Sequence, residues 1–166
     1  MAKKILPAIE EFKKRLRYCP KTGLTIWLIS PNNQLQPGSR AGNTNPNGYR
    51  HITIFGRRWA EHRLAWFLMT GCLPASQIDH KNGNRSDNRW CNLRPASACD
   101  NARNAKKRLR RVSEFKGIFK NTQGWTARVM IDGKRRSVGT FETAREAHNA
   151  YCRAATKHYG EFARFE

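Results

Sequence analysis

Apolar residues recur every three or four positions near the start of the chain. This helical spacing predicts a short amphipathic helix over residues 5–17, built on Ile5, Ile9, Phe12 and Leu16. The segment Gly23–Leu28 then predicts a strand. Residues 30–48 are rich in Pro, Gly, Asn and Ser, and they predict a loop.

Residues 48–60 alternate between two faces of a predicted strand. Tyr49, His51, Thr53 and Phe55 fall on one face, whereas Arg50, Ile52 and Ile54 fall on the other. A turn at Gly56, followed by Arg57-Arg58-Trp59, predicts a β-hairpin. Two interpretations stay open: a basic hairpin that lies along DNA, or a small sheet that supports the next domain.

The middle of the chain carries helix and strand signals in turn. Leu64, Phe67 and Leu68 predict a helix over residues 61–70 that ends at Gly71. Residues 77–107 then predict strand, polar loop, strand and helix, with Ser97 as the N-cap of that helix.

The C-terminal part predicts three strands and a helix, over residues 116–120, 125–131, 135–141 and 143–159. Asp132-Gly133 predicts the tight turn between the second and third strands. The inward face of the sheet, toward the helix, would carry Trp125, Ala127 and Val129. The outward face would carry Thr126, Arg128, Met130, Arg135 and Ser137.

These elements predict an α+β protein of several small parts. Residues 1–60 form an N-terminal helix and small sheet, and residues 61–107 form a core of two strands and a helix. Residues 108–114 are a basic linker, and residues 115–166 are a three-stranded antiparallel sheet packed on one helix. Small domains are individually marginal in stability, and the apolar fraction here is only 39%.

The charge indicates the class of partner. The 166 residues include 32 Lys and Arg against 12 Asp and Glu, for a net charge of +20, and the excess is spread along the whole chain. Such a distribution is typical of a surface that follows a polyanion, so we expect double-stranded DNA as the partner. An anionic membrane surface is the alternative, although no apolar run is long enough to span a bilayer.

The five cysteines form no C-x-x-C pair, which argues against a disulfide framework and against a structural zinc site. The N-terminus lacks the apolar region of a signal peptide. We therefore expect reduced thiols and a cytoplasmic, nucleoid-associated protein, in the host cytoplasm if a phage encodes it.

The candidate chemistry lies between Asp79 and Asn101. Hydrolysis of a phosphodiester requires a base for water, a cation for the phosphate, and a group that orients the base. Asp79-His80 offers a hard oxygen ligand beside an imidazole, and Asn92 can fix the His80 loop. The amide oxygen of Asn101 can complete a Mg²⁺ site with Asp79 and water. For Asp79 and His80 to serve one site, the chain should leave regular strand geometry there.

An ordered set of residues resembles the HNH endonucleases, in particular the homing-type enzymes of phages and introns. The set comprises His62–Trp66, Gly71, Pro74, Ile78–Asn84, Asp87–Arg89, Asn92–Arg94, Asn101 and Asn104. The resemblance implies a ββα-metal (His-Me finger) fold with one divalent ion, Mg²⁺ or Mn²⁺, and no small-molecule cofactor. It implies His80 as general base, Asp79 and Asn101 as metal ligands, and Asn92 as the residue that orients His80. Asn88 is a rival for the orienting role, or else a turn residue of the loop.

Residues 115–162 resemble the plant Apetala-two or ethylene-response-factor domain, which lays its sheet in the major groove of DNA. The matching pieces are Lys116–Ile118, Trp125–Val129, Val138–Phe141, Thr143, Glu146-Ala147, Ala150-Tyr151 and Ala154-Ala155. Phe119 and Ser137 stand where the plant domain tends to have arginine and tryptophan, so its target sequence does not carry over. The alternative is a small packing domain with exposed cations.

These patterns predict a metal-dependent DNA endonuclease of homing or nicking type, acting as a monomer or a DNA-induced dimer. The alternatives are a catalytically silent, sequence-specific DNA-binding protein or regulator and an RNA-binding accessory protein. The predicted DNA contacts are the cations of the hairpin, the linker and the C-terminal sheet: Arg50, Arg57, Arg58, Lys106, Arg108, Lys116, Lys120, Arg128 and Arg135.

Overall fold

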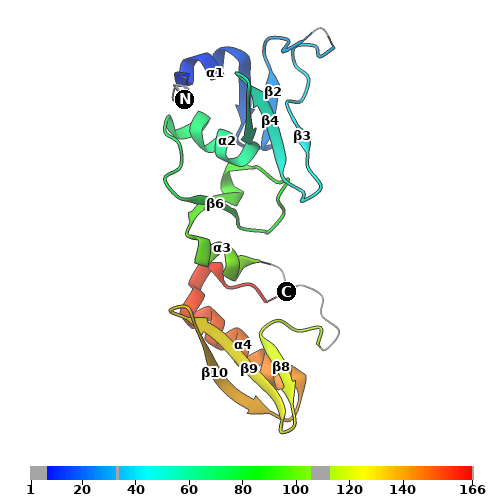
Figure 1. Cartoon of the computed structure of the whole chain (residues 1–166), viewed down its shortest axis with the longest axis vertical. Helices are drawn as coiled ribbons and strands as arrows, with labels where there is room; N and C mark the ends of the chain where they lie inside the picture. Colours follow the sequence, from blue (N-terminus) through cyan, green and yellow to red (C-terminus); the bar gives the residue numbers. More distant parts are fainter. Residues whose placement is uncertain (1–6, 33, 106–112, 166) are drawn as a thin grey trace. The chain divides into compact units, whose positions relative to one another are not determined.

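This computed structural model describes residues 7–32, 34–105 and 113–165 (Figure 1). Short strands and helices follow one another in these residues. The chain divides into two units, Met1–Ser97 and Ala98–Glu166. The elements of the first unit are α1 (Ile9–Arg15), β1 (Leu16–Cys19), β2 (Leu24–Trp27), β3 (Asn43–Thr44), β4 (Arg50–Ile54), β5 (Arg57–Ala60), α2 (Glu61–Thr70), β6 (Gln77–His80), the 3₁₀ turn η1 (Trp90–Asn92) and β7 (Leu93–Ala96).

Three small antiparallel sheets form the first unit: β1 with β2, β3 with β4 and β5, and β6 with β7. The hairpin predicted around Gly56 is confirmed, because β4 and β5 pair and join through Phe55 and Gly56, which both have positive φ. The predicted helix over residues 61–70 is also confirmed. It ends at Gly71, whose φ of 79° gives the left-handed cap that glycine favours.

One hydrophobic core spans the start of the chain and α2. Phe12 of α1 makes edge-to-face contacts with Phe55, Trp59 and Phe67, with ring centroids 5.0–5.4 Å apart. The same cluster contains Leu64 of α2. Residues 1–60 therefore do not form a part separate from α2, contrary to the predicted boundary at residue 60, because their core is completed by that helix.

The opposite side of α2 supports the β6–β7 hairpin. Ala65 packs with Ile78 and Leu93 in a second, smaller cluster. In the hairpin, Asp79 pairs with Arg94 and His80 pairs with Leu93. Asp79 and His80 thus both stay in the ladder, which corrects the expected departure from strand geometry. The chain turns only after His80, where Gly83 N donates to the His80 carbonyl oxygen.

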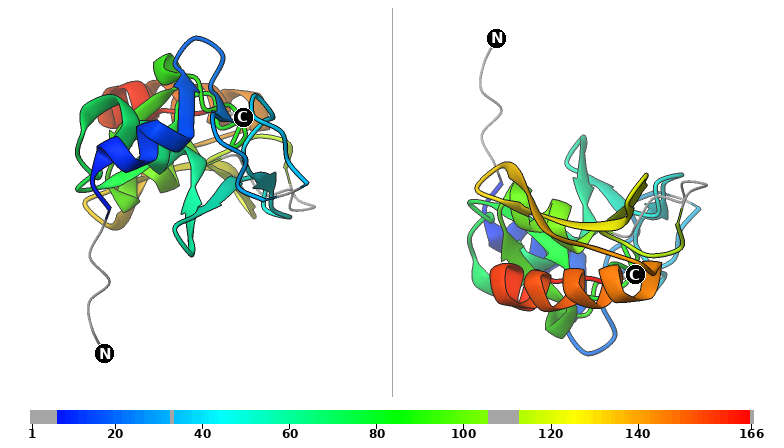
Figure 2. Two further views of the ribbon diagram at one scale, coloured as in Figure 1. Left: turned by 90° about the horizontal axis from the view of Figure 1, so that it is seen from above. Right: turned by 90° about the horizontal axis from the view of Figure 1, so that it is seen from below.

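The second unit contains α3 (Ala98–Asn104), β8 (Ile118–Asn121), β9 (Gly124–Ile131), β10 (Lys134–Phe141), α4 (Ala144–Tyr159) and η2 (Gly160–Phe162). The strands form an antiparallel sheet in the order β10-β9-β8, and α4 covers one face of it (Figure 2). This sheet and helix confirm the predicted C-terminal architecture. Asp132 and Gly133 have φ values of 49° and 72°, as the predicted tight turn requires.

The two faces of the C-terminal sheet differ as predicted, with one exception. Ala127 and Val129 are buried against α4, whereas Arg128 and Met130 are exposed. Thr126 pairs with the exposed Phe119 and Thr140 on the outward face as predicted, but its own side chain is only 4% exposed, and its hydroxyl bonds to Asn121 and Thr140. Within the described residues, no helix combines the length and the apolar character that crossing a membrane requires.

Candidate active site

The imidazole of His80 is held by a chain of buried hydrogen bonds. Its Nε2 atom lies 3.0 Å from Oδ1 of Asn88, whose Nδ2 donates to Oε2 of Glu61 at 3.0 Å. Nε of Arg50 donates to the same Glu61 oxygen at 2.8 Å. A carboxylate can only accept, so Asn88 must turn its amide hydrogens to Glu61 and its oxygen to His80. His80 therefore carries its proton on Nε2.

Aromatic rings surround the same histidine. The His62 ring lies 5.1 Å from the His80 ring, and the Tyr49 ring lies 6.0 Å from it, measured between centroids. Burial lowers the pKa of His62 to about 3, and the neighbouring His80 adds to the effect. Burial also lowers the pKa of His80, against the opposing hydrogen bond from Asn88. Both rings are thus neutral near pH 7, which is the state that a general base needs.

Asp79 is paired with Arg94, a residue of the HNH-like set for which the sequence indicated no role. Nε and Nη2 of Arg94 donate to Oδ2 of Asp79 at 3.0 and 2.9 Å, and both side chains are less than 10% exposed. The register explains the contact, because Arg94 stands directly opposite Asp79 in the hairpin. Arg94 thus balances the negative charge next to His80.

Asn92 holds the loop between β6 and β7. Its Oδ1 accepts from the backbone N–H of Asn82 at 3.0 Å, and its Nδ2 donates to the Asp87 carbonyl oxygen at 2.7 Å. The side-chain hydrogen bonds of Asn92 thus go to the loop backbone, as expected of a residue that fixes the His80 loop. The hydrogen bond of His80 Nε2 goes to Oδ1 of Asn88 instead.

Asp79 is the residue beside His80 that offers an oxygen ligand for a divalent ion. The described residues contain no group of three or more His, Cys, Asp or Glu that could hold a metal. A carboxylate has about four acceptor positions, so Asp79 can bind an ion while it accepts from Arg94. Carboxylate, amide and water oxygens suit Mg²⁺ or Mn²⁺. Asn101, the predicted second ligand, is partly exposed in α3 and belongs to the second unit.

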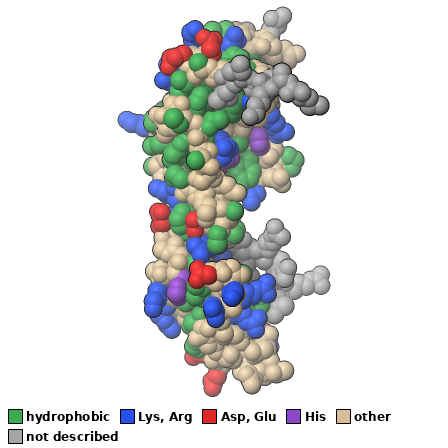
Figure 3. Space-filling view, turned by 60° about the vertical axis from the view of Figure 1, so that its left-hand side comes forward, with side chains coloured by type: hydrophobic (Ala, Val, Ile, Leu, Met, Phe, Trp, Pro, Cys, Tyr) green, Lys and Arg blue, Asp and Glu red, His purple; other side chains and the backbone are tan. Residues whose placement is uncertain are grey.

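The predicted DNA contacts of the first unit differ in exposure. Arg57 and Arg58 are exposed on β5, and Lys and Arg side chains are visible on the face of each unit in Figure 3. Arg50 is only 8% exposed and also donates to the carbonyl oxygens of Ala41 and Gly42. The prediction that Arg50 contacts DNA is therefore wrong, because its side chain points into the unit with Ile52 and Ile54.

The predicted contacts of the second unit also divide. Arg128 and Arg135 are exposed, and the Arg128 guanidinium lies 5.1 Å from the centre of the exposed Phe119 ring. Lys116 differs from the prediction that it contacts DNA, because its half-buried ammonium donates to the carbonyl oxygens of Arg103 and Ala105. Burial and the nearby Arg164 lower the pKa of Lys116 to about 8.

Lys120 lies on the face of the sheet that α4 covers. It is paired with Trp125 in the register, and its ammonium is 5.7 Å from the Trp125 ring. A phosphate contact from Lys120 would therefore come from the sheet margin. Lys106 and Arg108 lie outside the described residues.

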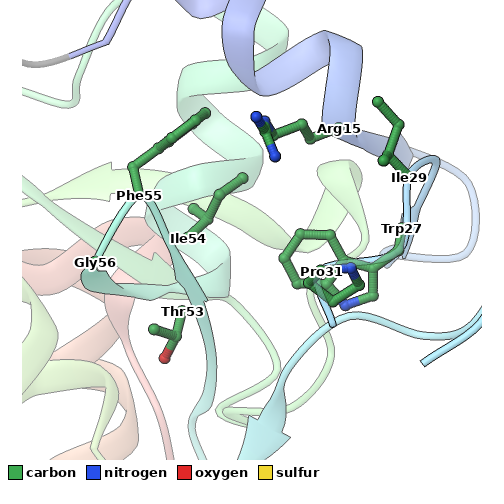
Figure 4. A pocket seen from close by; sticks show the side chains of 8 residues that line it. All are labelled: Arg15, Trp27, Ile29, Pro31, Thr53, Ile54, Phe55 and Gly56. Atoms are coloured by element: carbon green, nitrogen blue, oxygen red, sulfur yellow. The ribbon is translucent and has the colours of Figure 1, made fainter. Parts of the chain in front are cut away.

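A pocket of about 300 Å³ opens elsewhere in the first unit, between β2 and the β4–β5 turn (Figure 4). Arg15 reaches over the Phe55 ring at 5.3 Å, and Trp27, Ile29 and Pro31 line the other side. Arg15 is the one ionisable group of its lining. The lining of the pocket thus offers no base, in contrast to the surroundings of His80.

Comparison with protein families points to the segment of the chain that contains His80. Residues 60–103 match the model of the HNH endonuclease family, a segment that includes His80, Asn92 and Asn101. The match supports a DNA nuclease of the HNH type, and HNH nucleases generally use a divalent metal ion. Neither the curated proteins nor the solved structures yielded a match.

Proposed function

We propose that this protein is a metal-dependent DNA endonuclease in which His80 is the general base. The observation that carries the proposal is the buried imidazole of His80, held by Asn88 within a segment that matches the HNH endonucleases. A base must be unprotonated to accept a proton from water, and it must be held in one orientation. His80 satisfies both requirements.

In this proposal Nδ1 of His80 accepts a proton from the water that attacks the scissile phosphate. Nδ1 is the ring nitrogen that carries the lone pair when Nε2 is protonated. Asp79 and Asn101 would hold the divalent ion. When bound, the ion supplies charge stabilisation for the scissile phosphate and the leaving 3′ oxygen. Asn92 keeps the loop after His80 in place through its two backbone contacts. The products would be a 5′-phosphate and a 3′-hydroxyl, with one strand cut by each active site.

The C-terminal sheet would supply duplex binding, in the manner of the Apetala-two domain. Its outward face presents Arg128 and Arg135 from neighbouring strands, with the exposed Phe119 beneath Arg128. Arginine is the side chain best suited to reading guanine in the major groove. We include in the same proposal that the enzyme is of the homing type found in phages. It would act as a monomer or as a dimer that forms on DNA.

The proposal is tested on supercoiled plasmid. We expect conversion to the nicked form with Mg²⁺ or Mn²⁺ and none with a chelator. Asp79→Asn should lose most of the activity, because an amide is a weaker ligand for a hard cation than a carboxylate. Asp132→Asn is the matched control, since Asp132 is exposed in the β9–β10 turn. Cleavage that survives both chelation and Asp79→Asn would refute the metal site.

The Asp79–Arg94 pair favours a second candidate, a DNA-binding protein without cleavage activity. A carboxylate already neutralised by an arginine binds a cation less strongly than an isolated one. This alternative predicts tight, salt-sensitive DNA binding and intact plasmid at every divalent ion tested.

A further inference from the structure

We infer that Glu61 and Asn88 are positioning residues that fix His80 in its Nε2–H tautomer and so select Nδ1 as the base nitrogen. The inference rests on the proposed nuclease function of His80. It adds two residues that act on the reaction through His80.

The order of donors and acceptors in the series of hydrogen bonds from Arg50 to His80 fixes the direction of each bond. Arg50 can only donate, so Glu61 receives from it at 2.8 Å. The same Glu61 oxygen receives from Asn88 Nδ2, which leaves Oδ1 of Asn88 for His80. Were Asn88 turned over, two acceptors would meet at Glu61. Glu61 therefore sets the tautomer of a ring that it does not touch.

The backbone of Asn88 is clamped independently of its side chain. Tyr18 Oη donates to the Asn88 carbonyl oxygen at 2.7 Å. The β1–β2 turn also lies against it, because a Cβ on Gly23 would come within 2.5 Å of the Asn88 carbonyl carbon. Asn88 itself is 1% exposed. The amide is thus held from both ends, as orienting a ring requires.

Stability alone does not explain a glutamate at this position. Glu61 is fully buried, and its Oε1 atom has no hydrogen-bond partner within the described residues. Burying a carboxylate is costly, and one well-paired oxygen offsets only part of the cost. Apolar side chains in place of both Glu61 and Arg50 would fill the same space without that cost. We attribute the glutamate to its effect on Asn88 and His80.

The charged and titratable groups that face His80 come from three elements. Asp79 precedes it in β6, Asp87 and Arg85 belong to the following loop, and His62 packs from α2. Asn88 makes a hydrogen bond to a ring nitrogen of defined identity, Nε2. Replacing Glu61, which holds Asn88, should therefore change the tautomer of His80 and the rate constant of cleavage more than it changes substrate binding.

The test compares two substitutions of Glu61 in the full chain. Glu61→Gln keeps an acceptor oxygen for Arg50 and Asn88, whereas Glu61→Met removes it at similar size. We expect kcat for plasmid nicking to fall about 10- to 100-fold in Glu61→Met, as for other residues that orient a functional histidine, with KM changed less than about twofold. Glu61→Gln should stay within about threefold of the parent. Glu142→Met, at an exposed site, is the control.

Nitrogen-15 NMR of the imidazole groups supplies a readout that needs no activity. The His80 signals, assigned by their loss in His80→Gln, should show the Nε2–H form in the parent and in Glu61→Gln. Glu61→Met should show a mixture of tautomers. An Nδ1–H form in the parent would overturn the inference, even if Glu61→Met fails to fold. So would a folded Glu61→Met protein with parental kcat. A parent that shows the Nε2–H form but cuts no DNA would instead remove the proposed function.

Discussion

Charge is compensated locally around His80. Arg50 pairs with Glu61, and Arg94 pairs with Asp79, each through side chains no more than 10% exposed. Buried ion pairs are often no more stabilising than apolar packing of the same volume, whereas removing one partner is costly. We therefore attribute these two pairs to the electrostatics of the site. They pair each of the two carboxylates, Asp79 beside His80 and Glu61 behind Asn88, with an arginine.

The lowered pKa of His62 gives a prediction for stability against pH. Its folded pKa of about 3 lies below the ordinary value of 6.5, so the unfolded chain binds the proton more readily. The His62 contribution is therefore fully present above about pH 6.5 and is lost as the pH falls toward 3. In His62→Phe we expect the slope of the free energy of unfolding against pH to fall by up to about 1.4 kcal/mol per pH unit, the value for one proton.

Urea unfolding between about pH 4 and pH 7, followed by tryptophan fluorescence, measures this slope. A Trp125→Phe background confines the signal to the first unit, which holds the other four tryptophans. Equal slopes for His62→Phe and the parent would contradict the assigned burial.

Elements with local periodicity were predictable from the sequence. The C-terminal sheet and helix, the β4–β5 hairpin and α2 follow from alternation, helical spacing and turn residues. The same alternation placed Arg50 with Ile52 and Ile54, and that face proved to be the buried one. Its partner Glu61 is on another element, so periodicity gave no sign of it. Arg94 lies opposite Asp79 only in one register, which the loop length alone does not fix.

The β1–β2 turn gives a prediction at the element scale. Gly23 has a φ of 73°, and a Cβ there would lie 2.4 Å from the Arg89 nitrogen. Gly23→Ala should therefore displace the Asn88–Arg89 backbone and lower plasmid nicking, with a loss of stability of about 1–3 kcal/mol. Gly38→Ala is the control, because it has a similar φ of 87° and open space around it. Parental nicking and stability in Gly23→Ala would show that the turn does not hold Asn88.

The outward face of the C-terminal sheet gives a second prediction at this scale. Replacing Arg128 and Arg135 with Ala should weaken duplex binding and reduce the slope of log K against log salt by about 2, one for each arginine that no longer binds the duplex. The matched control is the pair Arg145 and Arg153, exposed on α4. Binding titrations of the two double variants at several salt concentrations measure the affinity and its salt dependence. Equal weakening in the two double variants would show that the sheet face is not the binding surface.

At the scale of the whole molecule, the sequence predicted the local elements better than the division into units. Domain boundaries depend on which core each element joins, and α2 joins the cores on both of its sides. α3, predicted to close the nuclease core, belongs to the second unit, where Lys116 bonds to its C-terminal carbonyl oxygens. Joint metal binding by Asp79 and Asn101 stays a prediction.

The most direct test of the nuclease account is the nicking rate of His80→Ala beside that of His158→Ala, measured on supercoiled plasmid with Mg²⁺. His158 is exposed on α4 and has no role in the proposed reaction. General-base catalysis contributes about 10²- to 10⁴-fold, so His80→Ala should lose at least about 100-fold in rate, while His158→Ala cuts like the parent. A His80→Ala protein that nicks plasmid as fast as the parent would contradict the account.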